Sequence, residues 1–326
     1  MSMKKVFWAA LFAALIIGVP IAARAAFSAR EILKPPGIFL VYETKSEKVL
    51  SLSPADYLTG CLYAQIPVDY DMEALKAQAV ASYTYALRVI RSGERNPKPE
   101  YRKKDDKGEE VSVYLSNDLS VCQGYYTREQ AKAAWGADYE KYYKNVRGAA
   151  EYGAGKIIIY NDEPIYAVYH RTSNGQTNSA ADVWGRDFPY LRGVDSSWDR
   201  DTPNFTRINE MTDEQVRSLL TAANPQMRVP LSPGEWFTDA VQNGAGYVSS
   251  IKLGENLLSG GDVWRTLGIN STCFSITHSD GVFAVSTRGI GHGVGLSQSG
   301  ARYMAEKGYT AEEILAYYYP STTLYG

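Results

Sequence analysis

The sequence contains few of the residues that bind metal ions or build disulfide frameworks. Only three cysteines and three histidines occur among its 326 residues. The cysteines stand far apart, at Cys61, Cys122 and Cys273, and form no C-x-x-C pair. This spacing predicts neither a zinc knuckle nor a dense disulfide framework. The histidines also lack paired ligand spacing, so we predict no metal site and no cofactor.

An excess of charge of either sign is also missing. The chain has 34 basic and 36 acidic side chains, which gives a formal net charge of -2. Because nucleic-acid-binding proteins usually carry a basic patch or stripe, we predict no nucleic-acid partner. Apolar residues make up 45% of the chain, which is enough to bury a core. Any partner is therefore expected to be recognised by a local site on a folded domain.

The first residues contain a long apolar run. Lys4 and Lys5 precede an uncharged segment over residues 6–23, and a run of about 18 apolar residues just spans a bilayer. The basic flank on the N-terminal side orients that end to the cytoplasm and places the remainder across the membrane. We therefore predict a single-pass protein of the cell membrane with an extracytoplasmic C-terminal domain.

The end of the apolar run leaves two alternatives. Ala23-Arg24-Ala25 fits the small-x-small pattern of a signal-peptidase site, so cleavage to a soluble product competes with retention as an anchor. Residues 1–26 are accordingly predicted to be a signal anchor or a signal peptide. A juxtamembrane linker is expected over residues 27–37, because Pro35-Pro36-Gly37 breaks regular structure. The globular domain is predicted over residues 38–326.

Helical and β-type segments are mixed along this domain. Apolar residues recur in steps of three and four from Met72 to Ile90 and predict the clearest helix. Other helices are predicted over residues 212–222, 297–307 and 310–318. Strands are predicted over residues 38–42, 48–52, 156–160, 165–169, 246–253, 271–277 and 282–286. The charged stretch 101–110 is expected to be a mobile loop. This order predicts an α+β fold, a single mixed helix-and-sheet domain behind an N-terminal transmembrane helix.

Three segments, in this order, resemble the stage II sporulation protein D family, which shares its domain with amidase-enhancer proteins. The first extends from Asp56 to Leu87 and includes Gln65-Ile66-Pro67. The second begins with His170-Arg171-Thr172-Ser173-Asn174-Gly175-Gln176. The third is Gly289-Ile290-Gly291-His292-Gly293-Val294-Gly295, with Gln298 and Tyr318-Tyr319-Pro320 behind it. Three long motifs in one order are far more specific than a single short one.

The resemblance implies a lytic transglycosylase that cuts peptidoglycan glycan strands during engulfment of the forespore and prefers strands stripped of their stem peptides. In the family's reaction one glutamate protonates the leaving glycosidic oxygen and then acts as the base. An arginine one helix further along is the family's second important residue. Stage II sporulation proteins P and M are the partners that the resemblance implies.

Both of these family positions are substituted in this chain. The glutamate corresponds to Gln65 and the arginine to Tyr83. A glutamine amide has nearly the shape of a carboxyl group but has no titratable proton, and general acid catalysis is worth about 10²- to 10⁴-fold in rate. Tyr83 carries no charge and lies on the apolar face of its helix, where a core position is the favoured interpretation. Whether the chain is an enzyme is therefore left open by its sequence.

Polar and aromatic side chains of the second and third segments are predicted to bind the glycan. Their donors, acceptors and ring faces suit sugar hydroxyls and sugar rings. They are His170, Thr172, Ser173, Asn174, Gln176, Trp184, His292 and Gln298. A buried structural role is an equal alternative for His292, because the glycines around it allow a tight turn. His170 and Ser173 do not indicate a serine hydrolase, because no nucleophile-elbow pattern surrounds the serine.

Three functions are consistent with these features. The favoured one is a tethered protein that binds peptidoglycan glycan strands and has weak or absent lytic activity. The second is an active lytic transglycosylase in which Asp69, Asp71 or Glu73 replaces the missing acid. The third is a non-enzymatic scaffold of the engulfment complex that has no affinity for glycan.

Overall fold

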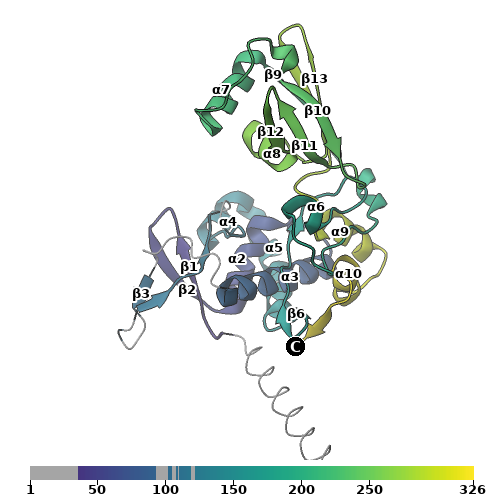
Figure 1. The fold of residues 1–326 in the computed structure, drawn as a ribbon. Helices are drawn as coiled ribbons and strands as arrows, with labels where there is room; N and C mark the ends of the chain where they lie inside the picture. Colours follow the sequence, from purple (N-terminus) through teal and green to yellow (C-terminus); the bar gives the residue numbers. More distant parts are fainter. Residues whose placement is uncertain (1–35, 93–101, 105–107, 109, 119–121) are drawn as a thin grey trace, which may run out of the picture.

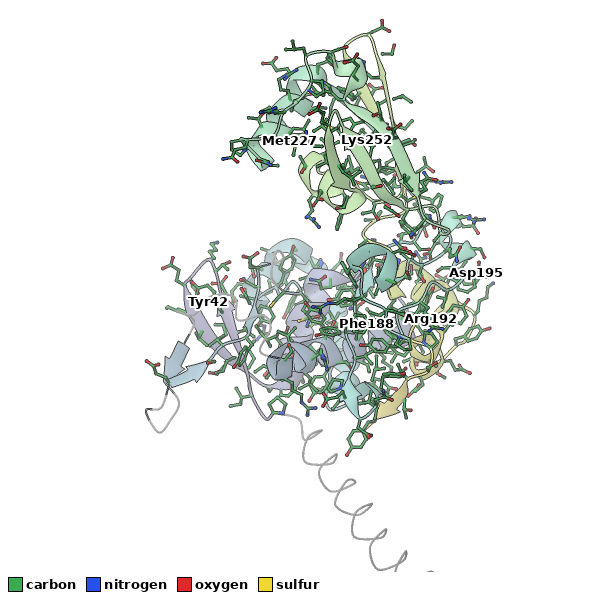
Figure 2. The ribbon with its side chains drawn as sticks, in the orientation of Figure 1. Tyr42, Phe188, Arg192, Asp195, Met227 and Lys252 are labelled. Atoms are coloured by element: carbon green, nitrogen blue, oxygen red, sulfur yellow. The ribbon has the colours of Figure 1, made fainter. Side chains whose placement is uncertain are left out.

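The computed structural model of the chain describes residues 36–92, 102–104, 108, 110–118 and 122–326. It consists of two lobes (Figure 1). Residues 206–288 form the smaller lobe, and the segments before and after them form the larger one. In Figure 2, Tyr42, Phe188 and Arg192 lie in the larger lobe, whereas Met227 and Lys252 lie in the smaller lobe.

The larger lobe is built around helix α3 (Met72–Ser92). Its side chains are buried except at the two ends of the helix and along one edge. Four helices pack against it: α2 (Pro54–Gln65), α5 (Tyr139–Gly153), α9 (Gln298–Glu306) and α10 (Ala311–Tyr318). Small side chains allow this close packing. A Cβ atom added to Gly153 of α5 would lie only 2.7 Å from the Cβ atom of Ala79. The alanine-rich sequence of α3 therefore makes it the centre of the larger core.

Short sheets and helices surround this helical core. One sheet has the order β2 (Lys48–Leu52), β1 (Phe39–Glu43), β5 (Leu115–Ser116), and another has the order β16 (Thr323–Tyr325), β6 (Ile157–Tyr160), β7 (Glu163–Pro164). Two pairs complete the strands: β8 (Tyr169–His170) with β15 (Leu296–Ser297), and β3 (Arg102–Lys104) with β4 (Glu110–Ser112). The remaining helical segments are α4 (Arg128–Trp135), η1 (Gly136–Asp138), α6 (Ala180–Trp184) and η2 (Ser197–Asp201).

The smaller lobe has a core of its own. One sheet has the order β10 (Phe237–Gln242), β11 (Val248–Leu253), β12 (Asn256–Ser259), and the other has the order β13 (Phe274–Ser279), β14 (Val282–Arg288), β9 (Thr206–Thr212). Its helical segments are α7 (Asp213–Ala223), η3 (Pro233–Glu235) and α8 (Gly260–Leu267). The buried ring of Trp236 stacks on Phe283 with 5.2 Å between the ring centroids. The apolar residues thus gather in two clusters, one for each lobe.

The predicted mixture of helices and sheets is confirmed, and most predicted elements lie within a few residues of the observed ones. One predicted strand is wrong: residues 165–168 form no strand, because β6 pairs with β16 on one edge and with the short β7 on the other. The charged stretch 101–110 is not simply a loop, since β3 and β4 pair across it. Among the described residues, no helix is long and apolar enough to cross a membrane. The anchor predicted at residues 1–26, and the linker up to residue 35, lie outside those residues.

Candidate functional site

A cleft with a volume of about 510 Å³ is lined by residues of both lobes. Four of the side chains predicted from the sequence line it: Gln65, His170, Trp184 and His292. Sequence reasoning missed several others, among them Tyr85, Tyr169, Trp264 and Arg265. Residues of both lobes therefore surround Gln65, for which the resemblance implies the position of a catalytic glutamate.

Gln65 is the last residue of α2, and its backbone carbonyl is held by a neighbouring helix. The side-chain nitrogen of Gln298, at the start of α9, donates to the Gln65 carbonyl at 2.9 Å and to Gln78 Oε1 at 3.0 Å. The Nε2 atom of Gln65 itself is buried and has no hydrogen-bond partner among the described residues. Gln298 is thus a positioning residue rather than part of the cleft lining. Gln65 presents an amide to the cleft.

His170 and His292 are neutral in this site. Burial lowers the pKa of His170 to about 3 and that of His292 to about 4. Nδ1 of His170 lies 3.1 Å from the Val294 carbonyl and is assigned as the donor, which leaves Nε2 buried without a partner. Nδ1 of His292 accepts from the Val294 backbone N–H at 3.0 Å. Neither imidazole is therefore in the cationic form that acts as a general acid near neutral pH.

Each lobe contributes a tryptophan to the cleft. Trp184 lies on α6, is 44% exposed and approaches His292 with 5.6 Å between the ring centroids. Trp264 lies on α8 of the smaller lobe and is half-buried. Exposed indole faces are suited to stacking on sugar rings. The prediction that Trp184 lies at the site is consistent with this placement, whereas no motif in the sequence indicated Trp264.

The described lining of the cleft contains no carboxylate. Among the residues that the structure describes, no aspartate or glutamate lines it, and Arg265 is the only lining residue with a permanent charge. No group of three or more His, Cys, Asp or Glu side chains within the described part of the chain is placed to hold a metal ion. All three cysteines are buried, and no disulfide joins them in the described part of the chain.

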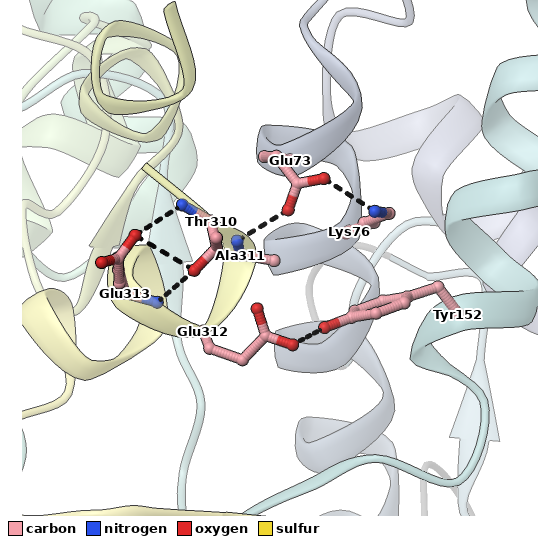
Figure 3. A network of polar contacts seen from close by, with 7 residues as sticks. All are labelled: Glu73, Lys76, Tyr152, Thr310, Ala311, Glu312 and Glu313. Atoms are coloured by element: carbon pink, nitrogen blue, oxygen red, sulfur yellow. Dashed lines mark hydrogen bonds and ion pairs between the residues drawn. The ribbon is translucent and has the colours of Figure 1, made fainter. Parts of the chain in front are cut away.

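The candidate replacement acids lie elsewhere. Asp69 and Asp71 are exposed and do not line the cleft. Glu73 connects two helices: it pairs with Lys76 Nζ at 2.7 Å and accepts from the Ala311 backbone N–H at 2.9 Å, at the start of α10 (Figure 3). The carboxylate of Glu73 therefore has a structural role, and its position does not favour the active-enzyme hypothesis.

Tyr83 lies in the core of the larger lobe and not at the cleft. Its side chain is fully buried and stacks on Phe39, with 5.7 Å between the ring centroids. Burial raises its pKa to about 12. Tyr85, two residues further along α3, lines the cleft instead. The core position favoured for Tyr83 by the helical periodicity is confirmed.

None of the predicted polar residues at positions 172–176 lines the cleft, and Asn174 and Gln176 lie in the joint between the lobes. Thr172 Oγ1 pairs with Ser299 Oγ at 2.8 Å, and the Ser173 backbone N–H donates to the buried carboxylate of Asp199 at 2.8 Å. The Asn174 side chain donates to the Ala245 carbonyl at 2.6 Å. The Gln176 carbonyl accepts from the Tyr247 hydroxyl at 2.9 Å. The contacts of Thr172 and Ser173 lie within the larger lobe, whereas those of Asn174 and Gln176 connect it to the smaller lobe.

The glycine-rich segment 289–295 follows the same joint. Gly289, Gly291, Gly293 and Gly295 all have positive φ angles, a backbone conformation that residues with a Cβ atom rarely adopt. A Cβ atom on Gly293 would lie 2.5 Å from the Tyr247 hydroxyl oxygen. Gly293 therefore permits a close approach to the smaller lobe, whereas the other three glycines lie against residues 168–173 of the larger lobe.

Comparison with known proteins agrees with the motifs. The family model described as "Stage II sporulation protein" matches residues 42–160. Stage II sporulation protein D of Bacillus subtilis (strain 168) is 32% identical over 289 residues, which cover 87% of this chain and 78% of that protein. The chain belongs to the stage II sporulation protein D family.

Other relatives agree with this assignment. The family member from Bacillus amyloliquefaciens is 32% identical over 86% of this chain and 76% of its own length. The amidase enhancer of Bacillus subtilis (strain 168) is 23% identical over 82% of this chain and 40% of its own length. The resemblance inferred from the three motifs is thus confirmed, and it supports a sporulation protein related to cell-wall processing.

Proposed function

We propose that this protein binds peptidoglycan glycan strands in the cleft between its lobes and has little or no lytic activity of its own. The observation that carries the proposal is the chemistry of the lining: an amide at Gln65, at the position of the family's acid, and no carboxylate among the described lining residues. The tryptophans from the two lobes, Trp184 and Trp264, supply ring faces on which sugars stack. The cleft thus retains binding groups without the acid.

The two histidines of the lining do not supply the missing proton near neutral pH. The pKa values of His170 and His292, about 3 and about 4, leave both imidazoles unprotonated near neutral pH. Loss of a general acid costs about 10²- to 10⁴-fold in rate. A glycan can therefore be held at Gln65 by hydrogen bonds while its glycosidic oxygen is not protonated.

A sedimentation assay with purified, peptide-stripped cell wall tests the binding. The full chain is expected to sediment with the wall, and the double variant Trp184→Ala, Trp264→Ala is expected to remain largely in the supernatant. Tyr309→Ala is the matched control, because Tyr309 is an exposed aromatic residue that does not line the cleft. A wild-type chain that stays in the supernatant would favour the scaffold hypothesis over this one.

We further propose that the domain acts outside the cytoplasm, tethered by the N-terminal apolar run, where homologues of stage II sporulation proteins P and M are the partners to test. The basic residues Lys4 and Lys5 before that run support this orientation. A C-terminal alkaline phosphatase fusion should be active in cells. An inactive fusion, together with a fluorescent cytoplasmic reporter at the same site, would contradict the proposed topology.

A further inference from the structure

Helix α8 of the smaller lobe presents two adjacent side chains, Trp264 and Arg265, to the cleft. Its start is fixed by a capping box: Ser259 Oγ accepts from the Asp262 backbone N–H at 3.0 Å, and Asp262 Oδ2 accepts from the Ser259 backbone N–H at 3.1 Å. The helix also lies tightly against β11, since a Cβ atom on Gly260 would be 2.0 Å from the Val248 carbonyl oxygen. The two side chains therefore project from a well-anchored element.

Arg265 determines the charge of the cleft. It is the only described lining residue that is charged near neutral pH, because both lining histidines are neutral and no carboxylate is present there. Its guanidinium donates to Asp262 Oδ1 at 2.8 Å, but the two side chains are 66% and 51% exposed. Exposed pairs of this kind are weak, and one contact leaves most guanidinium N–H groups available to an anion. The cleft is thus suited to a ligand with a carboxylate beside a sugar ring.

We propose that Arg265 selects glycan strands with free lactyl carboxylates, the groups that muramic acid residues expose when no stem peptide is attached. This inference rests on the proposed function, since it assigns a specificity residue to the same cleft. A stem peptide converts the lactyl carboxylate to a neutral amide, so the peptide-linked strand offers Arg265 no anion at that position. Trp264 provides a ring face beside the guanidinium, which allows one helix to contact both the sugar and its acid group.

Titration calorimetry with soluble oligosaccharides of equal length tests the inference on the full chain. The three ligands are a peptide-free glycan oligomer with free lactyl carboxylates, the same oligomer with these groups converted to methylamides, and a neutral oligomer of N-acetylglucosamine. The wild-type chain should bind the free acid about tenfold more tightly than its methylamide, as expected for one charge-assisted hydrogen-bonding contact. Raising the salt concentration should reduce this preference and leave binding of the neutral oligomer unchanged.

Three variants make the test specific. Arg265→Gln should abolish the preference for the free acid over the methylamide. Arg207→Gln, which removes an exposed arginine of β9 that does not line the cleft, should keep the preference. Asp262→Asn retains a capping oxygen but removes the competing charge, so it should tighten binding of the free acid by about two- to threefold.

The outcomes separate this inference from the proposed function. Equal affinity of the wild-type chain for the free acid and the methylamide, or a preference that persists in Arg265→Gln, would overturn the role of Arg265 while glycan binding stands. Failure of the wild-type chain to bind any of the three oligomers would overturn glycan binding itself and the inference with it.

Discussion

Gln65 presents an amide to the cleft at the position where the family resemblance implies a catalytic acid. Its backbone is fixed by Gln298, and its side-chain nitrogen is buried without a partner in the described structure. A carboxyl group in the same place would be partly desolvated, which raises a pKa and keeps the proton available to a leaving oxygen. Under the proposed function, an amide in place of a carboxyl group at residue 65 separates the binding of glycan from its cleavage.

Replacement of Tyr83 by arginine tests whether position 83 can supply the family's cation. Tyr83→Arg should lower the free energy of unfolding by about 3–5 kcal/mol, because it places an unpaired charge against Phe39 in the core. The loss is measured by urea unfolding. Tyr83→Phe, which keeps the stacked ring, is the control and should change the stability by less than about 1 kcal/mol. Unchanged stability of Tyr83→Arg would show that the position opens to solvent or to the cleft.

The buried histidines make stability depend on pH. The folded-state pKa values, about 3 for His170 and about 4 for His292, lie below the usual value near 6.5, so the unfolded chain binds protons that the folded chain does not. Stability should be unaffected by these groups above about pH 6.5 and should fall from there toward pH 4, by at most about 1.4 kcal/mol per pH unit for each histidine.

Thermal unfolding between pH 7 and pH 4 measures this effect. His170→Asn keeps a donor toward the Val294 carbonyl and removes one titrating group, so its melting temperature should fall less steeply with acidification than that of the wild-type chain. Parallel melting curves for the two proteins across this range would be inconsistent with a buried, neutral His170.

At the scale of elements, the joint between the lobes is made by two loops and one tyrosine. The loop at 172–178 and the glycine segment 289–295 both contact Tyr247 of the smaller lobe. Its hydroxyl accepts from the Asn174 backbone N–H at 3.1 Å and donates to the Gln176 carbonyl. Substitutions in these loops should therefore act through the relative placement of the lobes, and through it on the cleft.

Gly293 is the position where this joint is most sensitive. Gly293→Ala should cost at least about 1 kcal/mol more than Gly268→Ala, because both residues have positive φ angles but only Gly293 faces a close neighbour, Tyr247. Urea unfolding and sedimentation with stripped cell wall measure the two effects. Equal costs in the two variants, with unchanged sedimentation, would show that the glycine has no role in the joint.

At the scale of the whole molecule, the sequence predicted local features better than their arrangement. The apolar stripe of α3 and the capping box of α10 depend on neighbouring residues, and both helices were found. The division into two lobes depends on contacts between segments that are far apart in the sequence. A local sequence pattern does not predict such contacts. For the same reason Trp264 and Arg265 were missed, although Ser259 and Asp262 form a capping box that could have predicted a helix there.

The candidate site shows the same division between local and long-range information. The motifs placed Gln65, His170, Trp184 and His292 correctly at one cleft, because the family resemblance carries long-range information. Hydrogen-bonding capacity alone could not show that Thr172 and Ser173 find their partners inside the larger lobe. A polar side chain in a loop fits an internal contact as well as it fits a ligand.

The release of anhydro-muropeptides from peptide-stripped glycan, measured by mass spectrometry, tests the central claim most directly. The wild-type chain should bind the glycan and release few or no anhydro products, whereas Gln65→Glu should release measurably more because it restores a proton donor at the cleft. Robust release by the wild-type chain would contradict the account, and its loss in Asp69→Asn, Asp71→Asn or Glu73→Gln would identify the carboxylate responsible.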